Sequence, residues 1–97
     1  MDEDALLILH EVLIKVRRWR RGPVHVYRDR IEAATVEGRI DLRTATLEHV
    51  ARVRRTFTGL RLVVEGPDGS LQIRGLTPAD AATAQRIIGN AARAARA

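Results

Sequence analysis

RLVVEGPDGSLQIRGL, residues 61–76, is the stretch that most strongly predicts how this chain folds. Apolar and polar residues alternate on both sides of a central GPDG sequence at 66–69. A period of two places an apolar row on a core face and a mostly polar row outside. In the turn, Pro presets φ, Asp bonds to nearby backbone and Gly tolerates positive φ. The stretch therefore predicts a β-hairpin with strands over 61–65 and 70–75.

A helix start follows the second of these strands directly. Thr77 is placed to cap the helix, Pro78 suits its first position, and Asp80 lies near the positive end of the helix dipole. Small residues recur on one face, which allows close approach to a sheet. The sequence predicts a C-terminal helix over 78–95, with Gly89-Asn90 as an earlier stop.

Three further strands are expected upstream of the hairpin, over 24–28, 31–36 and 39–43. The last two alternate around Glu37-Gly38, which is typical of a second hairpin turn. Together the five strands predict a mainly antiparallel sheet.

The first part of the chain predicts an N-terminal helix over 5–21. Acidic residues lie at its start and arginines at its end, which matches the helix dipole, and Gly22-Pro23 provides a stop. A helical face with a spacing of three and four is formed by Leu6, Leu9, Val12, Leu13, Val16 and Trp19 or Arg20.

Residues 45–57 fit two structures. As a helix, they place apolar residues on one face, with Thr44 or Thr46 as a cap and Gly59 as a stop. As a strand, neither alternate row is purely apolar. A helix fits better, and it gives an α+β fold with three helices on the sheet. The alternative, a bent strand, gives a pleckstrin-homology-like barrel with a C-terminal helix.

Composition bounds the class of protein. The 97 residues are expected to form one domain, residues 1–97, and 45% are hydrophobic, which is ordinary for a globular protein. Cysteine is absent, which excludes a disulfide framework and fits a reducing compartment. The acidic start differs from a secretory signal, and no apolar run approaches the ~20 residues of a spanning helix. A cytoplasmic protein without a membrane span is expected.

The sequence offers little for catalysis. His10, His25 and His49 do not have the spacing of helical metal ligands. No Ser or Thr lies in a nucleophile-elbow context, and GPDG lacks the Lys of a phosphate loop. We therefore predict a protein that is not an enzyme, with no catalytic residue, no metal, no cofactor and no small-molecule substrate.

Positive charge is the clearest functional signal. The net charge is +5, and all the basic residues except Lys15 are arginines. With Trp19 and Phe57 beside them, two clusters could hold an anion or a nucleic-acid backbone while a ring stacks on a base. The alternative is that they are solvated helix ends whose stems cover apolar surface. The clusters are Arg17, Arg18, Arg20 and Arg21, and Arg52, Arg54 and Arg55.

Trp19 beside arginines is also typical of an interface anchor, although it could instead be a lid over the core. The residues predicted to bind a partner are Trp19, Leu9, Val16 and Phe57. We predict a non-catalytic protein–protein interaction or assembly module, with a partner protein or a second copy of the chain. Nucleic-acid or acidic-surface binding through the arginines is the alternative.

Residues 47–88, LEHVARVRRTFTGLRLVVEGPDGSLQIRGLTPADAATAQRII, resemble the end of the small effector-associated adaptor domains of actinobacterial conflict systems. The shared pattern is a basic helix end, an alternating strand, GPDG, a second strand and a closing helix. This resemblance implies an adaptor that binds other proteins.

Residues 24–42, VHVYRDRIEAATVEGRIDL, followed by LEHVARV, a hairpin and a helix, are similar in strand order to bacterial pleckstrin-homology-like domains. The resemblance requires 47–55 to be a strand. It yields six strands where the family has seven, and it leaves 5–21 without a counterpart. It implies a non-enzymatic binding or scaffolding module.

Overall fold

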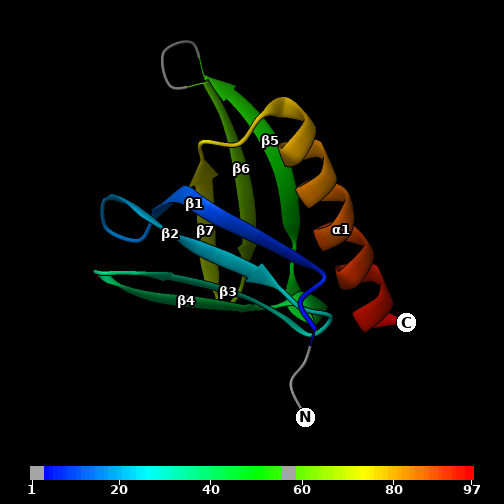
Figure 1. Cartoon of the computed structure of the whole chain (residues 1–97). Coiled ribbons are helices and arrows are strands. Elements are labelled where there is room, and N and C mark those ends of the chain that lie inside the picture. Colours follow the sequence, from blue (N-terminus) through cyan, green and yellow to red (C-terminus); the bar gives the residue numbers. More distant parts are fainter. Residues whose placement is uncertain (1–3, 56–58) are drawn as a thin grey trace.

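The computed structural model describes residues 4–55 and 59–97. It is a seven-stranded antiparallel sheet followed by one long C-terminal helix, with a single short 3₁₀ turn, η1 (Figure 1). The elements are β1 (Leu7–Lys15), β2 (Trp19–Val26), β3 (Arg30–Thr35), β4 (Gly38–Arg43), η1 (Thr44–Thr46), β5 (His49–Arg55), β6 (Gly59–Gly66), β7 (Gly69–Arg74) and α1 (Pro78–Arg96).

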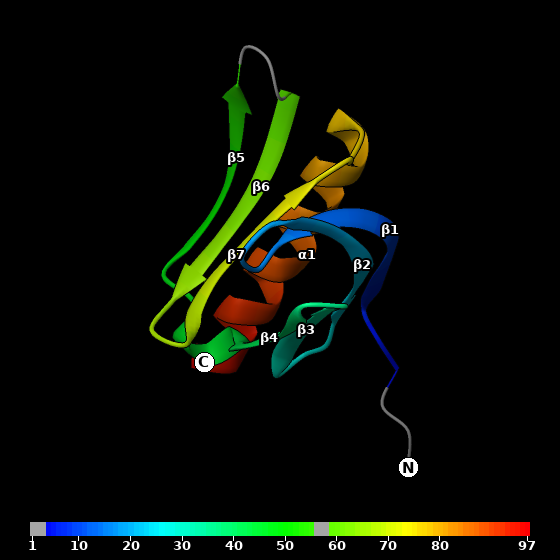
Figure 2. The same ribbon diagram turned by 90° about the vertical axis from the view of Figure 1, so that its left-hand side faces the viewer.

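The strands follow the order β4-β3-β2-β1-β7-β6-β5. Strands that pair in the sheet are also consecutive in the sequence, except where β1 pairs with β7. Figures 1 and 2 show the sheet folding over, so that β1–β4 cross β5–β7, with α1 running beside β5 across the opening.

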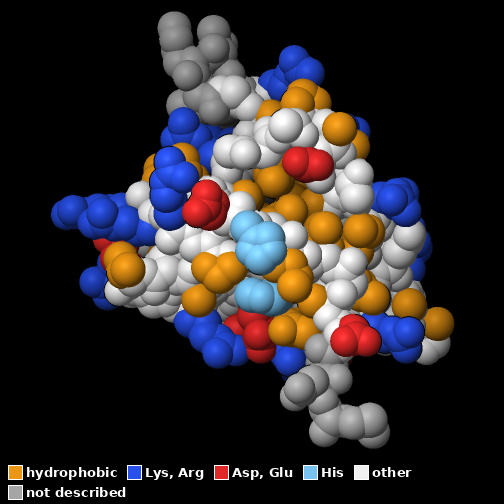
Figure 3. Space-filling model, viewed as in Figure 1, with side chains coloured by type: hydrophobic (Ala, Val, Ile, Leu, Met, Phe, Trp, Pro, Cys, Tyr) orange, Lys and Arg blue, Asp and Glu red, His pale blue; other side chains and the backbone are white. Residues whose placement is uncertain are grey.

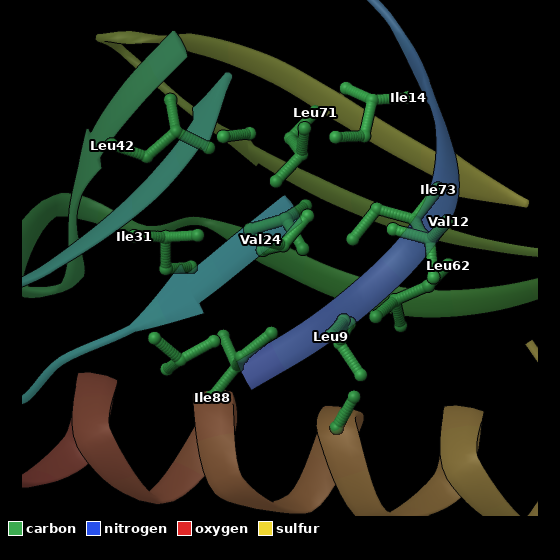
Figure 4. Close-up of a cluster of buried hydrophobic side chains, with 14 of the residues drawn as sticks. Leu9, Val12, Ile14, Val24, Ile31, Leu42, Leu62, Leu71, Ile73 and Ile88 are labelled. Atoms are coloured by element: carbon green, nitrogen blue, oxygen red, sulfur yellow. The ribbon is translucent and has the colours of Figure 1, made fainter. Parts of the chain in front are cut away.

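The core lies between the two halves of the sheet and α1 (Figure 4). It is aliphatic, and Ile14, Leu62 and Ile73 are fully buried at the centre. On α1, Ala84 and Ile88 are also fully buried, because alanines let the helix approach the sheet closely. The core side chains labelled in the figure are Leu9, Val12, Ile14, Val24, Ile31, Leu42, Leu62, Leu71, Ile73 and Ile88.

The expected N-terminal helix over 5–21 is wrong, because this segment forms β1 and the start of β2. The pairing of β1 with β2 shifts by one residue between Leu9 and Val12, and Glu11 has a φ of 53° there. This β-bulge lies opposite Pro23, which has no N–H for the ladder. Because of the bulge, the buried residues Leu9 and Val12 are three positions apart and not two, and a spacing of three is also typical of one face of a helix.

The expected helix over 45–57 is also wrong. The described part of this segment forms the end of η1, a connection and the edge strand β5. On the side of β5 toward α1, the Arg52 Nε donates to Gln85 Oε1 at 2.7 Å, and Gln85 donates back to the Val50 carbonyl at 3.0 Å. A polar residue on the covered face removes the apolar alternation of an ordinary strand. The α+β fold with three helices is therefore replaced by one sheet and one helix.

The predicted hairpin and C-terminal helix are confirmed. Gly66 pairs with Gly69 at the end of β6 and β7, and Thr77 caps α1 by accepting the Asp80 N–H at 3.1 Å. Asp68 differs from expectation, since its carboxylate bonds to residues distant in sequence. It accepts the Arg43 N–H at 3.1 Å and Thr46 Oγ1–H at 3.3 Å, and so joins the turn to the end of β4.

Gly22 was expected to stop a helix, but it lies inside β2, where the strand presses on β3. A Cβ on Gly22 would stand 2.0 Å from the Ala34 carbonyl oxygen and 3.3 Å from the Ile14 Cδ1. Only glycine allows this close approach of two backbones.

No helix of 4–55 or 59–97 is both long and apolar enough to cross a membrane.

Candidate functional site

Trp19 is the first residue of β2, immediately after the turn that joins it to β1. It pairs with Lys15, which in turn pairs with Gln72 of β7. The neighbouring pair, Ile14 and Ile73, points into the core and is fully buried. Because side chains alternate along a strand, Trp19, Lys15 and Gln72 share the outer face of the sheet.

Two arginines lie over the Trp19 ring. The guanidinium carbon of Arg61 is 5.2 Å from the ring centroid, and that of Arg74 is 5.0 Å from it. Arg61 also donates to Gln72 Oε1 at 3.3 Å. Each cation–π contact contributes about 0.5–1 kcal/mol at an exposed site. The half-buried ring is therefore held on the outer face by two neighbouring strands, β6 and β7.

Several basic residues near Trp19 have no carboxylate partner in the described part of the chain. No carboxylate of the described residues lies within ion-pair distance of Lys15, Arg17, Arg18, Arg21 or Arg74. Figure 3 shows basic side chains gathered where the β1–β2 turn projects from the body of the domain. We call this group the Trp19 surface; its residues are Lys15, Arg17, Arg18, Trp19, Arg21, Arg61, Gln72 and Arg74.

Arg20 was predicted with the first cluster, but it has a structural partner. Its Nε donates to Glu37 Oε1 at 2.9 Å, and Glu37 Oε2 accepts the Arg18 N–H at 3.3 Å. The hydrogen bond from Arg20, helped by that from Arg18, holds the pKa of Glu37 below its ordinary value, against partial desolvation that acts to raise it. Arg20 therefore ties the start of β2 to the β3–β4 turn.

The second predicted cluster does not join the first. Val53 is the residue of β5 that pairs with Arg61 on the outer face, so Arg52 and Arg54 lie on the opposite face. Arg52 is held by Gln85 of α1, and Arg54 is exposed. The side chain of Arg55 is outside the described part of the structure.

The residues predicted to bind a partner are also dispersed. Leu9 is in the core and only 8% exposed, while Val16 is half-buried in the β1–β2 turn. Phe57 lies outside the described residues. Of the three that the structure describes, Trp19 is the one on the surface defined above.

Sequence reasoning did not assign Lys15, Arg61, Gln72 and Arg74 to a site. Three of them were visible as the outward row of the 61–76 hairpin. What was missing was the register that brings this row beside β1, because that pairing joins the two halves of the sheet, which are far apart in sequence.

The histidines do not gather into a metal site. His25 stacks on Tyr27, with ring centroids 6.2 Å apart. Within the described ranges, no three His, Asp or Glu side chains are placed to hold a metal ion together.

The chain matches no protein-family model and no curated protein at a significant level. A functional proposal therefore depends on the geometry of the Trp19 surface.

Proposed function

We propose that this domain is a non-catalytic, cytoplasmic interaction module that binds an acidic segment of a partner protein on the Trp19 surface. One observation carries the proposal. Arg74 lies over a half-buried tryptophan, and the basic residues that flank Trp19 in sequence and strand pairing (Lys15, Arg17, Arg18, Arg21) likewise have no carboxylate partner among the described residues, while the arginines on β3 and β4 are ion-paired.

The chemistry of the surface supports a carboxylate-rich partner. Arg binds carboxylates in a bidentate manner, and Trp and Arg are the side chains most often found as interface hot spots. A cluster of one sign of charge also accelerates association with an oppositely charged partner. Trp19 would supply apolar area at the centre, with Lys15, Arg17, Arg18, Arg21 and Arg74 around it.

Nucleic-acid binding is the second candidate, and the same unpaired cations favour it. Sheets that bind single strands use several aromatic side chains as stacking platforms. Among the residues that the structure describes, Trp19 is the one aromatic side chain of this surface, and two guanidinium groups already lie over its ring. An acidic protein segment therefore fits the surface better than a row of bases.

The two resemblances agree with a binding module. Seven antiparallel strands followed by a C-terminal helix support the resemblance to bacterial pleckstrin-homology-like domains, for which the sequence alone yielded six strands. Residues 5–21, which had no counterpart in that resemblance, contain β1 and the start of β2. The resemblance to effector-associated adaptor domains is supported by the hairpin and α1 only, because β5 replaces the helix end that it required.

The test is binding of a fluorescent Glu-rich peptide and of a single-stranded oligonucleotide to the whole domain. The variant R17Q/R18Q/R74Q should lose at least about tenfold in affinity for the peptide, and Trp19→Ala a similar amount. The matched control R30Q/R39Q/R43Q removes the same charge from ion-paired positions and should bind the peptide nearly as well as the wild type.

Two outcomes would overturn the proposal. Equal losses in the two triple variants would mean that only net charge matters. Preference for the oligonucleotide, with a steep loss of affinity from about 50 mM to about 200 mM salt, would favour nucleic acid instead. Sedimentation of the domain with and without Trp19→Ala tests self-association, and a dimer that Trp19→Ala dissociates would point to a second copy as the partner.

A further inference from the structure

The first half of β1 has an open backbone edge. β1 pairs with β2 from Leu7 to Lys15, but it pairs with β7 only over Leu13–Lys15. On that side, Leu7–Val12 meet no other strand in the part of the chain that the structure describes. Unpaired edge groups are a template for an added strand.

An apolar groove lies beside the start of this edge, against the second half of α1. Its volume is about 530 Å³. Leu6, at its β1 side, is 42% exposed although it is large and apolar. Figure 3 shows apolar side chains between the histidines over β1 and β2 and the helix at the right. The groove is lined by Leu6, Arg28, Ile87, Asn90, Ala91, Ala94 and Ala95.

The α1 side of the groove is basic. From Ala81 to Arg96, α1 contains arginines but no carboxylate. Arg86 and Arg93 lie four and three residues from Asn90, which places them beside it on the outer ridge of the helix. Figure 3 shows Lys and Arg side chains along this outer edge. On the opposite side Arg28 adds a positive charge to the lining, and Asp4 and Asp29 line the adjoining hollow, so an acidic partner would be attracted by the α1 side.

We propose that this groove binds an extended segment of a partner protein in which apolar and acidic residues alternate, and that the segment adds to β1 as an extra strand. A period of two would direct its apolar residues onto Leu6, Ile87 and Ala91. Its acidic residues would face Arg86 and Arg93. A second copy of this chain is a poor occupant, because it would bring two basic α1 sides together at a net charge of +5 each.

This site is separate from the Trp19 surface, since the β1–β2 turn and the end of α1 lie on opposite sides of the domain (Figure 1). The probe is an acetylated, amidated peptide of alternating Val and Glu, about eight residues long, with a Val-Lys peptide as its control. Both are titrated to about 1 mM into ¹⁵N-labelled R17Q/R18Q/R74Q domain, in which the Trp19 surface is disabled.

We expect the Val-Glu peptide to shift the amide resonances of Leu7–Val12 and of Ile87–Ala95, and the Val-Lys peptide to leave them unchanged. Equal effects of the two peptides would overturn the proposal, as would shifts confined to other strands. The two proposals can fail separately. If the Glu-rich peptide did not bind the Trp19 surface of the wild-type domain, the proposed function would be lost, but the proposal for the groove would still stand.

Leu6→Glu should weaken Val-Glu binding at least about tenfold, because it removes apolar area and adds repulsion. Val36→Glu is the matched control, since Val36 is 90% exposed at the β3–β4 turn, far from the groove. Wild-type affinity in a folded Leu6→Glu domain would overturn the proposal. So would a dimer that forms without peptide and is lost in Leu6→Glu, because the occupant would then be a second copy.

Discussion

Two regions on the outside of this sheet, called its two faces below, use arginine in opposite ways: one covers β3 and β4, and the other is the Trp19 surface. Over β3 and β4 the arginines are bound to carboxylates, whereas near Trp19 no described carboxylate pairs with Arg17, Arg18, Arg21 or Arg74. On β3 and β4, Glu32 accepts from Arg30 at 2.9 Å and from Arg39 at 2.8 Å, and Arg39 also bonds to Asp41 at 2.9 Å. The ion pairs of the domain are therefore not spread evenly, and we propose that the Trp19 surface, where several cations have no described carboxylate partner, is the one that binds a partner.

β2 lies between the two regions, because it contains Trp19 and pairs with β3. The largest expected effect on stability therefore comes from Gly22, where β2 is packed closely against β3. Gly22→Ala would place a Cβ 2.0 Å from the Ala34 carbonyl oxygen, which neither backbone can avoid without moving. We expect a loss of about 2–4 kcal/mol in the free energy of unfolding, measured by urea denaturation.

Gly89→Ala is the control for this substitution. Its Cβ would meet nothing closer than an Arg93 Nη1 at 3.7 Å, and alanine favours a helix. It should stabilise the domain by about 0.5–1 kcal/mol. A Gly22→Ala domain as stable as the wild type would show that β2 and β3 are not pressed together at this point.

The next largest effect separates the faces by function. Arg74→Gln removes one of the two cations over Trp19, and we expect its affinity for a Glu-rich peptide to fall about fivefold to tenfold. Its free energy of unfolding should fall by no more than about 1 kcal/mol, the contribution of the lost cation–π contact, since Arg74 has no carboxylate partner within the described residues. Fluorescence anisotropy and urea denaturation measure the two quantities, and a large loss of stability would place Arg74 with the structural arginines.

A smaller and opposite effect is expected on the paired face. Glu32→Gln leaves Arg30 and Arg39 without their shared carboxylate, so stability should fall by about 0.5–1 kcal/mol. Peptide affinity should stay at the wild-type level. If Glu32→Gln weakened peptide binding as much as Arg74→Gln, the division between the two faces would be lost.

The smallest effect concerns acid. Hydrogen bonds from Arg20 to Glu37, and from the Arg43 side chain and N–H to Asp68, hold the pKa values of these carboxyls below their ordinary values of 4.5 and 3.8. A carboxyl with a depressed folded pKa stabilises the fold above its unfolded pKa, and this contribution disappears as the pH falls through the folded pKa. Stability should therefore decline as the pH falls below about 4.5.

E37Q/D68N should show a shallower decline of unfolding free energy between pH 7 and pH 3. Glu48→Gln, at an exposed glutamate outside these ion pairs, is the control and should follow the wild type. An unchanged slope in E37Q/D68N would show that other carboxylates govern the acid response.

Local sequence chemistry predicted the second half of the fold better than the first. The 61–76 hairpin and the Thr77 cap depend on neighbouring residues only, and both are confirmed. The segment 5–21 failed because a bulge changes its period, and no local rule places a bulge before the partner strand is known. Residues 45–57 failed because Gln85, a residue of α1, satisfies a polar side chain on the covered face of β5.

The sequence predicted those residues of the candidate site that are adjacent in the chain, but not those that come from a distant strand. Arg17, Arg18 and Trp19 stand together in the chain and were recognised. Arg61 and Arg74 come from the other half of the sheet, and only the β1–β7 register brings them over the ring. Composition could not tell Arg20, which is paired with Glu37, from its unpaired neighbours.

The single pairing of β1 with β7 also determines the order in which the domain can assemble. Every other strand pair joins neighbours in sequence and can form as a local meander, but this one must bring Ile14 to Ile73. Closing so long a loop costs entropy before any contact is gained, so it should be a late and slow event in folding. Trp19 is the only tryptophan of the chain, and its arginine neighbours arrive with that closure. A change in Trp19 fluorescence during refolding should therefore report when the two halves of the sheet join.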